Sequence, residues 1–175
     1  MEPDIRSIRR KHEDSRTLLD NLLKKLPGFK GYMHYRERYA SDRMMRTYLA
    51  DVLISCKGEV DAIAKRLAQR GELAILPELN GINETLEKNA KTCQAADFGA
   101  SSSFSSAQAK FTSADQDRLI QYDTSLLGKV EAVRAAVAKL AGTEQVDAAG
   151  IGEVFRPIKE FERAFADRQH VLMGG

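Results

Sequence analysis

The sequence is poor in the residue types that build most metal and redox sites. Its 175 residues include only three histidines and two cysteines, and there is no tryptophan. Carboxylate-bridged metal sites in helical bundles use Glu-x-x-His pairs, and none of His12, His34 and His170 has Glu three positions before it. We therefore expect no metal and no cofactor.

Motifs for covalent and phosphoryl-transfer chemistry are missing as well. The chain has no Gly-x-Ser-x-Gly elbow for a nucleophilic serine, and it has no glycine-rich phosphate loop that ends in lysine. The tripeptide Asp97-Phe98-Gly99 matches the kinase metal-binding motif, but the other kinase motifs do not accompany it. We expect a protein that is not an enzyme and has no catalytic residues.

The two cysteines and the hydropathy pattern indicate the compartment. Cys56 and Cys93 are far apart and lie on apolar stripes, so we expect buried thiols and a reducing environment. No apolar run approaches the ~20 residues of a membrane span. The polar start, Met1 to Asp4, has no apolar segment, so we expect no secretory signal and a cytoplasmic protein.

Proline is also scarce, with four residues in the chain, whereas helix-forming residues are abundant. Apolar residues make up 43% of the chain and charged residues 30%, which is typical of a folded helical protein. We predict one all-α domain over residues 1–175, an antiparallel bundle of four to five helices with an irregular Ser-rich loop at about 96–113. The predicted helices cover roughly residues 4–25, 32–70, 77–95, 113–141 and 147–171.

The helix predicted over about 32–70 is the longest and has a near-heptad apolar seam. The seam consists of Met45, Leu49, Val52, Cys56, Val60, Ile63 and Leu67. Gly58 lies inside this helix and predicts a bend or a close helix contact, and Gly71 is suited to end the helix. Similar seams lead from Leu119 to Leu140 and from Ile151 to Phe165, and Pro157 is expected to kink or divide the last helix.

The segment from Leu26 to Tyr39 combines a Pro27-Gly28 turn with an aromatic stripe. Tyr32, Tyr35 and Tyr39 are spaced i, i+3 and i+7, so they share one helix face. Such a stripe most often packs on a neighbouring helix, but it also suits a binding surface.

Basic residues are concentrated in the same part of the chain. Residues 1–46 hold 12 Lys and Arg against 7 Asp and Glu, a balance of +5, whereas the remainder has a balance of −3. Together with Arg46, the basic residues near the turn suit an acidic partner, although acidic neighbours can neutralise them within the chain. The candidate interaction surface consists of Arg9, Arg10, Lys30, Tyr32, Tyr35, Arg36, Tyr39 and Arg43.

Three segments together resemble a bacterial family of small all-helical proteins. They are the Leu-Pro-Gly-Phe-Lys-Gly-Tyr turn at residues 26–32, the stretch from Thr92 to Phe111, and residues 117–127. The resemblance implies a helical fold and a bacterial protein of the cytosol. It implies no activity and no ligand.

These features favour a non-enzymatic bundle that acts through protein–protein interaction, with a protein partner of unknown identity and self-association to a homo-oligomer. The motivating feature is the long seam of the 32–70 helix, whose overhanging end would leave apolar surface to be covered. The alternative is an adaptor that binds an anionic surface, membrane phospholipid or nucleic acid, through the basic N-terminal quarter. The pI of about 8.5 is low for a dedicated nucleic-acid-binding protein.

Overall fold

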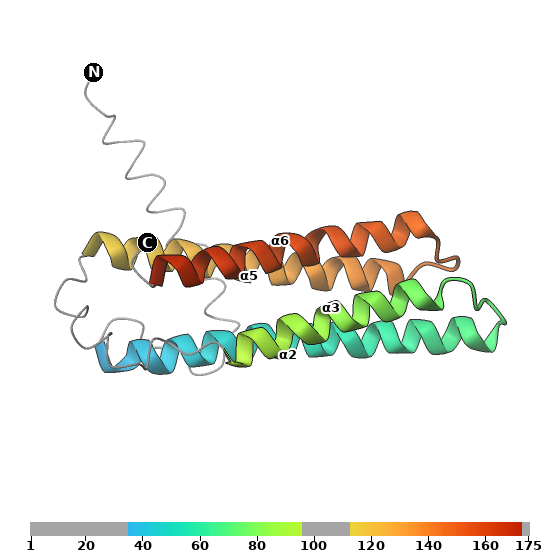
Figure 1. The fold of residues 1–175 in the computed structure, drawn as a ribbon, viewed down its shortest axis with the longest axis horizontal. Helices are drawn as coiled ribbons and strands as arrows, with labels where there is room; N and C mark the ends of the chain where they lie inside the picture. The colour runs from blue at the N-terminus through green and yellow to red at the C-terminus, as the bar shows by residue number, and fades with distance from the viewer. Residues whose placement is uncertain (1–34, 96–112, 173–175) are drawn as a thin grey trace, which may run out of the picture.

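A computed structural model describes residues 35–95 and 113–172, and these ranges form an all-α bundle of four helices (Figure 1). Helix α2 spans Tyr35–Gln69 and α3 spans Leu76–Ala95. Helix α5 spans Ser113–Ala141 and α6 spans Ala148–Leu172. The predicted fold class is therefore confirmed, whereas the predicted helix at 4–25 and the predicted loop at 96–113 lie almost wholly outside the described residues.

The four helices form two antiparallel hairpins, α2 with α3 and α5 with α6 (Figure 1). Each helix of one hairpin also contacts one helix of the other, α2 with α5 and α3 with α6. Between α2 and α5, Tyr48 bonds Glu131 and Arg66 bonds the carbonyl of Ala141, so residue numbers rise together along this contact. They also rise together between α3 and α6, where Gly81 lies beside Phe155 and Lys88 bonds Glu162. The two helices in each contact between the hairpins, α2 with α5 and α3 with α6, are therefore parallel to each other.

The apolar seams read from the sequence form the core between the hairpins. The seam of α2 is buried at all seven predicted positions, from Met45 to Leu67. In α6 the predicted face is buried at all five positions, Ile151, Val154, Ile158, Phe161 and Phe165. Burying apolar surface stabilises a fold by about 25 cal/mol per Å², and this is the main contribution that holds such a bundle together.

Helix α2 ends in a glycine cap that the sequence predicts. Gly71 has a φ of +78°, a conformation that costs L-residues free energy. Its N–H bonds the carbonyl of Ala68, and the N–H of Glu72 bonds that of Leu67, both at 3.0 Å. This pair of bonds is the Schellman motif, and it satisfies the last carbonyls of α2 before the chain turns into α3.

Two arginines at the end of α2 and directly after it bind the carbonyl end of α5 and the residues that follow it. Arg66 donates to the carbonyls of Ala141 and Thr143, and Arg70 donates to the carbonyl of Glu144, at 3.0 to 3.3 Å. Because α2 and α5 are parallel, their carbonyl ends lie together, and the guanidinium groups offset the partial negative charge there.

Of the alternatives expected at Gly58 and Pro157, the close helix contact and the division of the helix are wrong. Gly58 makes no close contact, because a Cβ atom at this position would meet nothing within 4 Å, and α2 continues through it without a break. Pro157 does not divide the last helix, which is continuous from Ala148 to Leu172. Val154, Ile158 and Phe161 are buried on both sides of the proline, and this packing holds the helix together.

Replacing Gly58 with alanine is expected to raise the free energy of unfolding by about 0.5–1 kcal/mol, because glycine is a poor helix former and the added methyl group meets open space. Urea unfolding followed by circular dichroism measures this change. Gly71→Ala is the matched control and should destabilise by roughly 1 kcal/mol, because its φ is positive. Destabilisation by Gly58→Ala would contradict the open environment described for this position.

Candidate interaction surface

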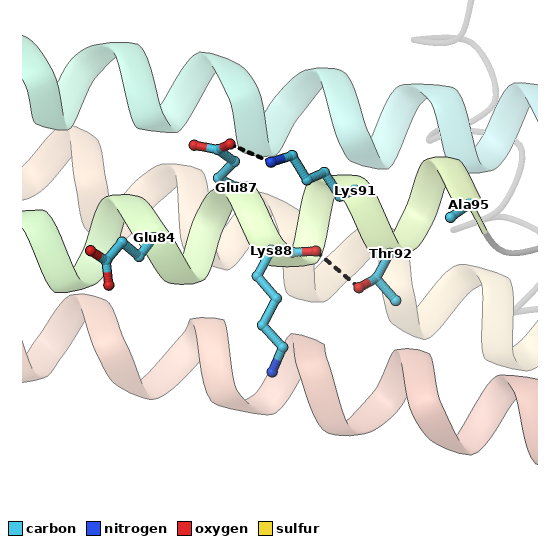
Figure 2. A pocket seen from close by; sticks show the side chains of 6 residues that line it. All are labelled: Glu84, Glu87, Lys88, Lys91, Thr92 and Ala95. Atoms are coloured by element: carbon cyan, nitrogen blue, oxygen red, sulfur yellow. Dashed lines mark hydrogen bonds and ion pairs between the residues drawn. The ribbon is translucent and has the colours of Figure 1, made fainter.

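The outward face of α3 carries a stripe of charged side chains around an open depression (Figure 2). Glu84, Glu87, Lys88 and Lys91 follow the spacing i, i+3, i+4 and i+7, so one helix face presents all four. We call these four residues the α3 stripe. With Thr92 and Ala95 they line a depression of about 550 Å³.

Ion pairs link the α3 stripe to both neighbouring helices. Within α3, Lys91 donates to Glu87 at 2.6 Å (Figure 2), and Lys57 of α2 lies 3.8 Å from the same carboxylate. On the other side Lys88 donates to Glu162 of α6 at 2.7 Å. The pKa of Glu87 is lowered, first by the hydrogen bond from Lys91 and then by the nearby positive charges.

These pairs are exposed, so they hold the side chains only weakly. The side chains of Lys88 and Lys91 are 68% and 71% exposed. Exposed pairs contribute about 0–1 kcal/mol each because water and salt screen them. The side chains of the α3 stripe can therefore leave their present partners at little cost in free energy.

The opposite face of α3 is fixed in the core, which makes the stripe part of a rigid support. Leu79, Ile82 and Leu86 are fully buried there. Asn83 donates to Asp61 of α2 at 2.6 Å, which is an additional polar link between the two helices.

Arg46 closes the end of α3. It is 7% exposed, and its Nη1 donates to the carbonyls of Cys93 and Gln94 at 3.3 and 3.4 Å. These carbonyls belong to the last turn of α3 and have no partner within the helix. A basic residue of α2 therefore acts as a tertiary cap next to the α3 stripe.

A buried ion pair lies toward the same end of the bundle. Nε of Arg168 in α6 donates to Oδ1 of Asp123 in α5 at 2.6 Å, and the two side chains are 3% and 1% exposed. We call Arg46, Asn89, Cys93, Asp123 and Arg168 the buried polar layer, to which all four helices contribute. The amide nitrogen of Asn89 is buried there without a hydrogen-bond partner.

Both thiols are buried and free, as the sequence predicts. Burial raises the pKa of Cys56 and of Cys93 to about 12 each, and the positive charges of Arg46 and Arg168 partly oppose this shift at Cys93. The reactive form of a cysteine is the thiolate, so neither residue is a nucleophile in the folded protein near neutral pH.

We expect neither thiol to react with a thiol reagent at pH 8 in the native protein, and both to react at once in urea. A pKa above the unfolded value means that the folded state keeps its proton longer. This contribution to stability is complete below about pH 9 and is lost as the pH rises toward 12. Reagent titration and urea melts between pH 7 and 11 measure both effects, and rapid native labelling would contradict the burial.

The structure describes only part of the surface that the sequence predicts. Arg43 is exposed on α2. Arg46, expected to help bind an anion, is instead buried because it caps α3. The remaining candidates lie outside the described residues or have side chains outside them, namely Arg9, Arg10, Lys30, Tyr32, Tyr35, Arg36 and Tyr39.

Sequence reasoning missed the buried polar layer, although a signal for it exists. Asp123 lies four residues after Leu119 and three before Leu126, which are positions of the predicted seam. Arg168 lies three residues after Phe165, and Asn89 lies three after Leu86. A polar residue at a seam position predicts a paired or hydrogen-bonded group in the core, because seam positions face neighbouring helices.

Within residues 35–95 and 113–172, no three His, Cys, Asp or Glu side chains come together in a way that suits a metal ion. None of the helices in these ranges is long and apolar enough to cross a membrane.

Comparisons with protein-family models, with curated proteins and with solved structures find no match. They therefore assign no family to the chain, and the resemblance based on residues 26–32, 92–111 and 117–127 stays a prediction.

Proposed function

We propose that this protein is a non-enzymatic helical bundle that acts by binding other proteins, a second copy of itself included. The observation that carries the proposal is the α3 stripe, an exposed set of Glu and Lys side chains on a helix whose other face is fixed in the core. The rigid backbone of α3 loses little conformational entropy when a partner binds, whereas each Glu or Lys side chain that the partner immobilises costs about 0.5–1.5 kcal/mol.

The surroundings of the thiols, of Asp123 and of Arg46 support a role without catalysis. Both thiols are buried with a raised pKa, and the carboxylate of Asp123 is engaged by Arg168. Arg46 is engaged by the end of α3. Each of these groups therefore has a structural explanation, whereas the α3 stripe is accessible and its ion pairs contribute little to the fold.

The proposal extends to the partner and the compartment. We propose a cytoplasmic location, because two free thiols suit a reducing environment. The alternative partner is an anionic lipid or nucleic-acid surface that binds the basic N-terminal quarter. Binding to acidic liposomes or polynucleotide that is lost on charge reversal at Arg9, Arg10 and Arg36 would favour that alternative.

The molar mass of the full chain in solution tests the proposal. Light scattering over about 1–100 µM should show a mass above the monomer that rises with concentration, since weak complexes form in this range. Chemical cross-linking in the native host, followed by mass spectrometry, should place cross-links at Lys88 or Lys91. A strict monomer that forms no cross-link to any protein would contradict the proposal.

A further inference from the structure

The α3 stripe has an order of charges that is complementary to itself. Its N-terminal half carries Glu84 and Glu87, and its C-terminal half carries Lys88 and Lys91. All four side chains share the outward face of α3. The side chains of Glu87, Lys88 and Lys91 are 46%, 68% and 71% exposed. If two such stripes run antiparallel, the acidic half of each faces the basic half of the other.

We propose that the α3 stripe is a docking surface for a second copy of this chain, related by a twofold axis that passes between Glu87 and Lys88. In this register Glu84 faces the partner subunit's Lys91, and Glu87 faces the partner subunit's Lys88. Twofold symmetry repeats each contact, because the same patch is used on both copies. This inference rests on the proposed function, since it names the partner and the surface of the same interaction.

The ion pairs of the single chain do not prevent this association. Lys91 must exchange Glu87, and Lys88 must exchange Glu162, for the carboxylates of the second copy. Exposed pairs of the same type are exchanged, so their small free energies nearly cancel. The complementary order of charges mainly fixes the register, because any other alignment brings like charges together at a cost in free energy.

The expected complex is weak. From Glu84 to Lys91 the stripe is only about 10 Å long, at about 1.5 Å of rise per residue. Stable complexes bury roughly 800 Å² on each partner, which one short stripe does not supply without its flanking residues. We therefore expect a dimer that forms at tens of micromolar and dissociates as salt screens the charges.

Charge reversal of one half of the stripe tests the pairing. The variant Lys88→Glu/Lys91→Glu carries an entirely acidic stripe, and Glu84→Lys/Glu87→Lys carries an entirely basic one. Each should self-associate at least about tenfold more weakly than the natural protein, because like charges then face each other. An equimolar mixture of the two variants should form a heterodimer.

Two further variants are controls. The fourfold variant with both halves exchanged should associate like the natural protein, because the order of charges is again complementary. Lys65→Glu/Lys139→Glu gives the same change in net charge as the acidic variant at exposed positions of α2 and α5, and it should leave association unchanged. Circular dichroism verifies that every variant is folded, and sedimentation equilibrium at low and high salt measures association.

The outcomes separate this inference from the proposed function. Loss of association in both half-variants, with recovery in their mixture, supports the α3 register. If the natural protein associates and both half-variants associate equally well, the α3 surface is wrong while self-association stands. If the natural protein is a monomer throughout, both this inference and self-association are overturned, and cross-linking to another protein would still support the wider proposal.

Discussion

Replacing Asp123 with asparagine is expected to lower the free energy of unfolding by about 3–5 kcal/mol, a large share of the stability of a domain of this size. The variant keeps the shape of the side chain but removes its charge. Arg168 is 2% exposed, so its Nε would lose a charged acceptor at 2.6 Å without gaining water in its place. Urea unfolding followed by circular dichroism measures the difference.

An exposed pair between the same two helices is the matched control. Lys129 of α5 lies 3.5 Å from Glu160 of α6, and their side chains are 31% and 55% exposed. Glu160→Gln should cost less than about 1 kcal/mol, because solvent screens this pair. Both substitutions remove one carboxylate charge from the α5–α6 interface. The difference between their effects on the free energy of unfolding therefore measures the effect of burial.

A double substitution shows whether the effect comes from an uncompensated charge. The double variant Asp123→Asn/Arg168→Met removes both charges. Its loss in free energy of unfolding should be smaller than the sum of the losses in the two single variants. Additive losses would show that Asp123 and Arg168 stabilise the bundle separately. A loss below about 1 kcal/mol for Asp123→Asn would contradict the buried ion pair itself.

The helices and their buried faces follow from the sequence because both depend on local periodicity. The seam from Met45 to Leu67 specifies a helix and the side of it that is buried, and the structure buries every position of it. Gly71 specifies the end of that helix, because a positive φ suits glycine. Such features depend on residues close together in the chain.

The contacts between hairpins do not follow from periodicity. The way in which the two hairpins dock makes α2 parallel to α5 and lets Arg66 cap α5. The apolar seams do not specify this docking. The same holds for Arg46, which looks like one more residue of a basic surface until α3 is placed beside it. The sequence also does not show that α6 continues through Pro157, because the packing on both sides of the proline outweighs the lost hydrogen bond.

The α3 stripe was likewise overlooked, although its four residues are visible in the sequence. Glu and Lys at these spacings are common on helices that face solvent, where they form pairs within the helix. The arginines and tyrosines near the N-terminus are the less common pattern, so the sequence points to them first. The structure adds that this face of α3 is outward, is linked to both α2 and α6, and borders a depression.

The second large effect is expected from truncating the core of α6. Phe161 is 1% exposed and is among the largest fully buried side chains of the described residues. Its ring lies nearly parallel to that of Phe165, with 6.0 Å between the centroids and 25° between the planes. Phe161→Ala should lower the free energy of unfolding by about 3–5 kcal/mol, because it removes the apolar burial of the ring and leaves a cavity.

The position of Phe161 also makes this variant a test of the whole bundle. Its neighbours along the face, Ile158 and Phe165, are buried too, so the helix cannot shift to fill the cavity without exposing one of them. Leu73→Ala is the control, because this side chain is 61% exposed and its loss should cost less than about 0.5 kcal/mol. A small and similar effect of both substitutions in urea melts would show that α6 does not pack its apolar face into a common core.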